Sequence, residues 1–303
     1  EMTNLSKDLR DKISKEFTIN PISVDLLQKS KDGTIKNGVK LHDGLMVESV
    51  LIPTESRTTA CVSSQVGCSL NCEFCATAKL KRMRNLEVAE IVDQVALIDK
   101  QSKLYFDRPL SNIVFMGMGE PMMNYKNVVD AIKKITDEDG LGMSARRITV
   151  STSGIPKMMR MLADENLKVK LALSLHSAIE HKRNEIMPFS TKFPLTEIME
   201  AMQYWYSKTE NRITFEYCVW KGINDGDEDI KALIKYCRQV PCKVNLIQYN
   251  PIGEGKFDHR SVEAEERYVR ELEKAGITVL VRRSRGGDID AACGQLANKN
   301  SGE

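Results

Sequence analysis

The sequence lacks any apolar run long enough to cross a bilayer, and it has no signal-peptide pattern. Its charge is also nearly balanced: 44 Lys and Arg stand against 42 Asp and Glu, a net charge of +2. Such a balance gives no overall attraction to nucleic acid or to a membrane, so any affinity for RNA has to come from local patches. Internal repeats and low-complexity tracts are absent as well. A globular chain of 303 residues remains, long enough to bury a core without disulfides.

What the chain does contain is cysteine, at eight positions. Without a secretion signal, these cysteines predict a protein of the reducing cytoplasm that has no membrane partner. In that compartment, clustered cysteines bind metals or carry out redox chemistry. The cysteines are therefore the first place to look for function.

The N-terminal part, residues 1–57, is expected to be a helix followed by a small β extension. Apolar residues at helical spacing predict a helix over residues 1–18, with Thr3 or Asn4 as its cap. Turn signals around Gly33 and Gly44, followed by an apolar run up to Pro53, predict short antiparallel strands. Because the first residue is not Met, we expect a trimmed sequence whose upstream accessory domain is missing.

From residue 58 to residue 303 the pattern changes to strands alternating with amphipathic helices. The expected strands are 59–64, 112–118, 147–152, 169–176, 213–220, 243–249 and 277–282, and the expected helices begin near Val88, Tyr125, Pro156, Leu195, Asp227 and Val262. This alternation predicts an α/β fold with about six parallel units, a partial (β/α)6 barrel. Since eight units close a barrel, this one is expected to stay open. Its chemistry should lie at the C-terminal ends of the strands.

Three cysteines follow the first of these strands in the pattern C-x3-C-x2-C: Cys68, Cys72 and Cys75. Three thiolates ligate three irons of a [4Fe-4S] cluster, which normally has four ligands. The fourth iron then remains free to be chelated by the amino and carboxylate groups of S-adenosylmethionine (SAM). The alternative is a structural zinc ion with Cys61 as fourth ligand, although such sites usually pair two separated C-x2-C motifs.

The cysteine motif, with Phe74 inside it, resembles that of the radical SAM superfamily. Three longer strings, at residues 61–68, 115–121 and 288–296, are similar to a narrower group. That group comprises the bacterial dual-specificity methyltransferases that methylate adenine C2 in 23S ribosomal RNA and transfer RNA. The resemblance extends from about Glu1 to Leu296.

This resemblance implies a set of SAM contacts at the ends of the predicted strands. They are Gly119, Glu120, Ser151, Ser174, Leu175, His176 and Asn250. Without the resemblance, the commoner interpretations are strand-ending turns, caps and a hydrogen-bonded interior histidine. The assignment to SAM therefore depends on the family.

The resemblance also implies the catalytic residues Cys293, Cys61 and Glu48. Adenine C2 is electron-poor and does not attack the methyl group of SAM, so the family first methylates a cysteine, here Cys293. A second SAM is cleaved by one-electron chemistry, the methyl carbon is joined to C2, and Cys61 releases the product by attacking the Cys293 sulfur, which leaves a transient disulfide. Glu48 matches the proton acceptor; otherwise it would be an exposed strand glutamate. Cys218, Cys237 and Cys242 are interpreted as structural.

The implied partners are 23S ribosomal RNA, transfer RNA and an electron donor such as flavodoxin, and the chain is expected to be a monomer. Two basic clusters flank the proposed chemistry and suit phosphate contacts: Lys79, Lys81, Arg82 and Arg84, and Arg282, Arg283 and Arg285. Two alternatives stay open. One is methylation at adenine C8 by the same mechanism, against which Pro121 favours C2, and the other is a non-catalytic, zinc-dependent RNA-binding protein.

Overall fold

The computed structural model describes residues 4–16, 22–253, 257 and 262–298. Ten strands form one sheet in the order β1-β2-β3-β4-β7-β8-β9-β10-β11-β12, and β5 pairs with β6 in a second sheet. The strands are β1 (Ser23–Lys29), β2 (Ile35–Lys40), β3 (Met46–Pro53), β4 (Thr58–Cys61), β5 (Gln65–Val66), β6 (Arg84–Asn85), β7 (Asn112–Phe115), β8 (Ile148–Thr152), β9 (Lys170–Ser174), β10 (Ile213–Cys218), β11 (Cys242–Ile247) and β12 (Thr278–Arg282). The α-helices are α1 (Lys7–Glu16), α2 (Val88–Phe106), α3 (Tyr125–Thr136), α4 (Pro156–Asp164), α5 (Glu180–Ile186), α6 (Leu195–Thr209), α7 (Asp227–Cys237) and α8 (Val262–Lys274).

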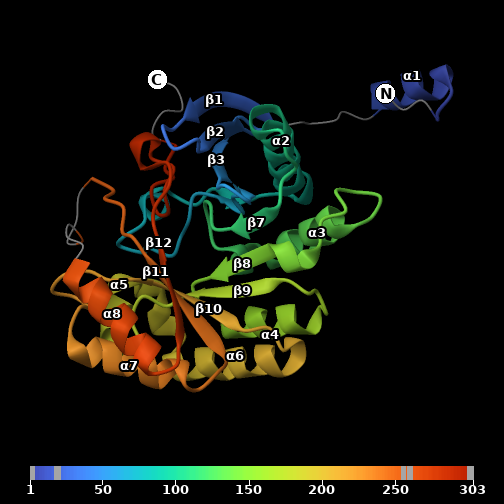
Figure 1. Cartoon of the computed structure of the whole chain (residues 1–303). Helices are drawn as coiled ribbons and strands as arrows, with labels where there is room; N and C mark the ends of the chain where they lie inside the picture. The colour runs from blue at the N-terminus through green and yellow to red at the C-terminus, as the bar shows by residue number, and fades with distance from the viewer. Residues whose placement is uncertain (1–3, 17–21, 254–256, 258–261, 299–303) are drawn as a thin grey trace.

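The strands from β4 to β12 in the large sheet pair parallel to one another. Each of the six connections between them contains at least one helix, and Figure 1 shows a curved sheet with these helices along its outer side. The predicted α/β partial barrel is thereby confirmed. Its parallel order brings the C-terminal ends of all these strands to one side.

The N-terminal β extension is also confirmed. The strands β1, β2 and β3 form antiparallel hairpins, and β3 pairs antiparallel with β4. The two hairpin turns contain Gly33 and Gly44 with φ of 86° and 81°, a region that glycine adopts without steric cost. The predicted domain boundary between residues 1–57 and 58–303 falls between β3 and β4, which pair with each other. The division into two domains stays a prediction.

Three expectations need correction. The first helix begins at Lys7, and its cap is Ser6, whose Oγ accepts a hydrogen bond from Leu9 N at 3.3 Å, rather than Asn4; Thr3 lies outside the described residues. Five of the seven strands end two or three residues before their predicted ends, because the chain there leaves the sheet and continues as a loop. The short helix α5 was not predicted, because seven residues carry too little periodicity.

Strand β10 shows how the sheet positions a site. All six of its residues are buried. Phe215 and Tyr217 point to the helical side, where their rings pack 5.7 Å from Tyr236 and 5.5 Å from Tyr268. Because side chains alternate along a strand, Glu216 and Cys218 point to the other face. Polar side chains are therefore held inside the barrel.

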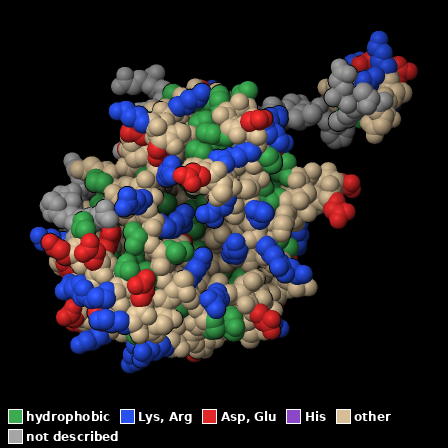
Figure 2. Space-filling view, viewed as in Figure 1, with side chains coloured by type: hydrophobic (Ala, Val, Ile, Leu, Met, Phe, Trp, Pro, Cys, Tyr) green, Lys and Arg blue, Asp and Glu red, His purple; other side chains and the backbone are tan. Residues whose placement is uncertain are grey.

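Positive charge gathers on one face although the net charge is small. Figure 2 shows Lys and Arg side chains over the middle of this face, in the region of β8 and β9. Lys170 is exposed, but partial loss of hydration lowers its pKa, and so do the nearby charges of Lys243, Arg147 and Arg57. These four cations form a cluster, here called the cation cluster, near the N-terminal ends of the strands.

Among the helices that the structure describes, none is long and apolar enough to span a membrane.

Candidate active site

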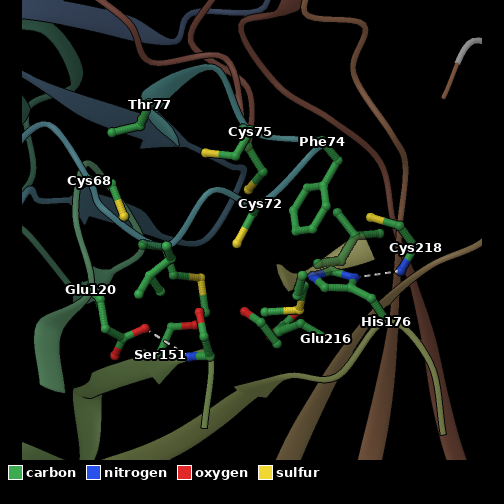
Figure 3. Close-up of a pocket in the computed structure, with 18 of the residues that line it drawn as sticks. Cys68, Cys72, Phe74, Cys75, Thr77, Glu120, Ser151, His176, Glu216 and Cys218 are labelled. Atoms are coloured by element: carbon green, nitrogen blue, oxygen red, sulfur yellow. Dashed lines mark hydrogen bonds between the residues drawn. The ribbon is translucent and has the colours of Figure 1, made fainter. Parts of the chain in front are cut away.

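The loop from Cys68 to Cys75 follows β5 at the C-terminal side of the barrel. It is fixed to the end of α5 by a hydrogen bond from Glu73 N to the Ile186 carbonyl at 3.1 Å. Figure 3 shows the sulfur atoms of Cys68, Cys72 and Cys75 facing a common space, and all three thiols are free. All three residues line one pocket.

This donor set fits a [4Fe-4S] cluster. Within the described ranges, no three His, Cys, Asp or Glu side chains converge closely enough to hold one metal ion. A cluster does not require such convergence, because each thiolate binds a different iron. Burial raises the pKa of Cys68 to about 11 and also raises the pKa of Cys72 and Cys75. Metal binding offsets this cost, since a coordinated thiol loses its proton.

Glu120 lies at the edge of the pocket after β7. Its carboxylate accepts hydrogen bonds from Met122 N at 3.0 Å and Ser153 N at 2.8 Å, and burial raises its pKa. Gly119 before it has φ of 92°, and a Cβ there would lie 2.4 Å from the Gln65 Cβ. Only glycine fits this turn, which places the carboxylate against the pocket.

His176 closes another side of the pocket. Its Nδ1 accepts a hydrogen bond from Cys218 N at 3.2 Å, and its ring lies 4.5 Å from the Phe74 ring. Burial, with a smaller effect from Arg183, lowers its pKa to about 3, so the imidazole is neutral at physiological pH. Ser151 and Ser174 line the same pocket. The side chain of Leu175 does not, because it is fully buried in the core.

The segment that carries Cys293 is docked onto the cysteine loop. Ala76 N donates to the Gly294 carbonyl at 2.7 Å, and Thr77 Oγ1 donates to the Leu296 carbonyl at 2.6 Å. Asn250 Nδ2 donates to the carbonyl of Cys293 itself at 3.2 Å. These contacts bring Cys293, 218 residues after Cys75, into the pocket of the three loop cysteines.

Cys61 and Cys293 meet in an adjoining hollow that both residues line together with Arg282. Burial raises the pKa of Cys61 to about 12, and the nearby charge of Cys293 adds to this shift. Cys293 is exposed toward the hollow, where partial loss of hydration raises its pKa, whereas Arg282 lowers the pKa of both thiols. The two cysteines thus lie close enough to influence each other.

Glu48 is buried and does not occupy the exposed position that its strand alone suggested. Its Oε1 lies 3.2 Å from Lys36 Nζ, and its Oε2 accepts a hydrogen bond from Ala297 N at 2.8 Å. It is not among the residues that line the two hollows. In this structure Glu48 anchors the C-terminal segment just beyond Cys293.

Three residues with a place at the site were not predicted from the sequence. Glu216 and Cys218 line the pocket from β10, and Arg183 lies behind it on α5. The alternation along β10 carried a signal, because Glu216 and Cys218 are two residues apart and share a face. Cys218, interpreted as structural, borders Cys293, whose charge raises its pKa after the larger effect of burial.

The two basic clusters differ in what they contact. Arg84 forms salt bridges within the protein, since its guanidinium lies 2.6 Å from the Asp43 carboxylate and 2.7 Å from the Glu90 carboxylate. The remaining members are exposed: Lys79, Lys81, Arg82, Arg282, Arg283 and Arg285. Arg84 therefore braces the loop, while the others remain accessible.

Comparison with known proteins agrees with this geometry. Residues 62–237 match the model of the radical SAM superfamily, whose members use a [4Fe-4S] cluster and SAM. The chain is 66% identical, over 99% of its length and 86% of the relative, to a probable dual-specificity RNA methyltransferase RlmN of Christiangramia forsetii. A probable dual-specificity RNA methyltransferase RlmN of Flavobacterium psychrophilum is equally similar, with 66% identity and the same coverage.

A solved structure is also similar over nearly the whole chain. The crystal structure of a radical SAM methyltransferase from Sphaerobacter thermophilus superposes with a TM-score of 0.93 at 40% identity, covering 97% of this chain and 86% of that one. The chain therefore belongs to the radical SAM superfamily and, within it, to the dual-specificity RNA methyltransferases RlmN, and it is a radical SAM RNA methyltransferase.

Proposed function

We propose that this chain methylates C2 of adenine in 23S ribosomal RNA, and also in transfer RNA, through an S-methylated Cys293. The observation that carries the proposal is the docking of Cys293 into the pocket of Cys68, Cys72 and Cys75. A methyl-bearing sulfur at that position borders the group that has to activate it. The relatives' names, dual-specificity RNA methyltransferase, support RNA as the substrate.

In this proposal Cys68, Cys72 and Cys75 hold the cluster, which with SAM supplies one-electron cleavage chemistry when bound. The SAM contacts are Gly119, Glu120, Ser151, Ser174, Leu175, His176 and Asn250, with Leu175 contributing only its backbone. Glu120 suits the ammonium group of SAM because it is the acidic side chain beside the glycine turn. Neutral His176 offers a ring face and a hydrogen-bonding nitrogen without adding charge.

The remaining steps use side chains of the chain itself. Cys293 first accepts a methyl group and loses its thiol proton. The one-electron chemistry of the cluster with SAM would take one hydrogen atom from the methyl carbon before that carbon bonds to C2, and would take up the one electron that the adduct then gives up. Glu48 takes the C2 proton, and the Cys61 thiolate attacks the Cys293 sulfur: a sulfur–sulfur bond forms, the sulfur–carbon bond breaks, and the released carbon takes a proton to complete the methyl group. A dithiol reductant restores both cysteines. Arg282 assists, because it favours the thiolate form of both.

The exposed cations around the site would hold the RNA. Arg282, Arg283 and Arg285 line the hollow that contains Cys61 and Cys293, and Lys79, Lys81 and Arg82 are exposed beside the cysteine loop. Contacts of this type bind phosphates irrespective of sequence and weaken as salt rises.

The test is product analysis with protein purified without oxygen. The chain is incubated with SAM, a reductant and a fragment of 23S ribosomal RNA, and the digested nucleosides are separated by mass spectrometry. We expect 2-methyladenosine from the wild type and none from Cys293→Ala. Recovery of 8-methyladenosine alone would overturn the position of methylation.

Metal content tests the site separately. We expect iron and sulfide in the wild type and their loss in the triple variant Cys68→Ala/Cys72→Ala/Cys75→Ala, with Cys237→Ala as the control outside the pocket. A colourless protein that contains zinc would favour the non-catalytic alternative.

We further propose a cytoplasmic monomer that receives electrons from a donor such as flavodoxin. None of the eight cysteines, all of which lie in the described residues, is paired in a disulfide, as is usual in a reducing compartment. Gel filtration and reduction by purified flavodoxin would test the other two points.

A further inference from the structure

Arg183 is a fully buried cation behind the pocket. Its whole side chain lies out of solvent, on helix α5. Its Nη2 donates hydrogen bonds to the carbonyls of Ser153 at 2.6 Å and Ser174 at 3.2 Å. The guanidinium therefore bridges the loop that follows β8 and the end of β9.

Three of its five N–H donors, those on Nε and Nη1, are unused. The Nε and Nη1 atoms of Arg183 are buried without a hydrogen-bond partner in the described part of the chain. A charged group in this position is strongly unfavourable unless something compensates for its charge. Such a residue points to a ligand of opposite charge at the same place.

The surroundings of Arg183 indicate where a ligand of opposite charge would bind. The ionisable side chains near Arg183 are Tyr236, Cys72 and Glu180. Tyr236 is a neutral phenol, and the carboxylate of Glu180 already accepts a hydrogen bond from Leu195 N at 2.9 Å. Ser153 and Ser174, whose carbonyls Arg183 contacts, line the same pocket as Cys72. Helix α5 is also tied to the cysteine loop through Ile186 and Glu73. The cation is thus held in fixed relation to Cys72.

We propose that Arg183 is the internal counter-ion of the iron–sulfur site, an inference that rests on the proposed function. When an external reductant adds one electron to that site, negative charge increases beside Cys72, and a fixed cation in a poorly solvated position stabilises it. No bond forms or breaks in this role. Arg183 sets how easily the site is reduced.

A purely structural role is the competing explanation. In that case Arg183 only braces the loop after β8 and the end of β9 through its two carbonyl contacts, and its charge is incidental. The two explanations differ in one measurable property. A brace alters stability, whereas a counter-ion also alters the reduction equilibrium.

The test compares neutral and charged replacements in the full chain, reconstituted with iron and sulfide without oxygen. Arg183→Gln and Arg183→Met remove the charge, and Arg183→Lys keeps it. Lys231→Gln is the matched control, because it removes one exposed cation on α7. The readout is a reductive titration with mediator dyes, followed by electron paramagnetic resonance.

For both neutral variants we expect an about tenfold lower equilibrium constant for reduction, a potential lower by about 59 mV for one electron. Arg183→Lys should stay within about twofold of the wild type, and Lys231→Gln should be unchanged. An unchanged potential in a neutral variant that holds full iron would overturn the proposal. Iron-free wild type would instead overturn the proposed function.

Thermal unfolding decides the matter if the neutral variants do not retain the cluster. Apo Arg183→Met loses two hydrogen bonds to buried carbonyls under either explanation, so the melting temperature has to be compared before and after reconstitution. The counter-ion role predicts that the neutral variants lose the rise in melting temperature on reconstitution and that Arg183→Lys keeps it. A rise lost alike in the Gln, Met and Lys variants would show a brace and refute the counter-ion.

Discussion

At the residue scale, Lys36 and Glu48 form an ion pair almost wholly removed from solvent, with side chains 2% and 4% exposed. Removing one partner of a buried pair leaves the other charge uncompensated. We therefore expect Glu48→Gln to lower the free energy of unfolding by about 3–5 kcal/mol, through the orphaned Lys36. Urea unfolding of the apo protein measures this loss.

The double variant Lys36→Met/Glu48→Gln is the control, because it removes both charges and should regain most of the stability. It also separates the two roles of Glu48. If Glu48 takes the C2 proton, the double variant is stable but makes little product. A Glu48→Gln protein as stable as the wild type would show that the pair is not the anchor described above.

Single residues also show where sequence reasoning stops. Cys68, Cys72 and Cys75 were predicted as ligands because their spacing alone brings three thiols into one loop. Arg183 had no such signal, since its role depends on the contact between α5 and a loop more than 100 residues earlier. Glu48 was predicted from the resemblance, but its burial was not, because burial depends on the C-terminal segment that covers it.

At the element scale, the segment bearing Cys293 depends on Thr77. The Thr77 hydroxyl donates a buried hydrogen bond of 2.6 Å to the Leu296 carbonyl. Thr77→Val keeps the shape but leaves that carbonyl unsatisfied, a loss of about 1 kcal/mol. We expect the segment to detach about fivefold more often. Hydrogen exchange at the amides of Ala76 and Ala297 should accelerate by that factor.

Thr191→Val serves as the comparison for this experiment. Its hydroxyl also donates to a carbonyl, that of Pro188 at 2.9 Å, but at an exposed position where water can replace it. Exchange at Ala76 and Ala297 should not change in this variant. Equal acceleration in both variants would mean that Thr77 does not hold the segment.

Whole elements were predicted well where periodicity is long. The six helices expected within residues 58–303 begin where the structure has them, because apolar residues recur over nine or more positions in each. The strands were predicted to extend too far, because residues such as Val62 and Met118 are as apolar as strand residues although they lie in loops beside the pocket. Amino-acid composition does not distinguish these loops from strands. Backbone geometry distinguishes them, because Gly119 and His176 have φ of 92° and 56°, outside the strand region.

At the scale of the whole molecule, alternation of strands and helices was sufficient to predict the open parallel barrel. The charge distribution was not predictable in the same way. A net charge of +2 conceals the cation cluster, because Arg57, Arg147, Lys170 and Lys243 are distant in sequence and meet only when β4, β8, β9 and β11 lie in one sheet.

The cation cluster makes stability depend on salt. Partial loss of hydration and three neighbouring cations lower the pKa of Lys170, so its charged form is disfavoured in the folded state. Salt screens this repulsion over about 10 Å at 0.1 M. We expect Lys170→Gln to raise the urea midpoint of the apo protein at low salt, with a gain that shrinks as sodium chloride is added. Lys168→Gln, two residues earlier and likewise exposed, is the comparison and should show neither effect. If the gain at Lys170 were independent of salt, repulsion would not be its cause.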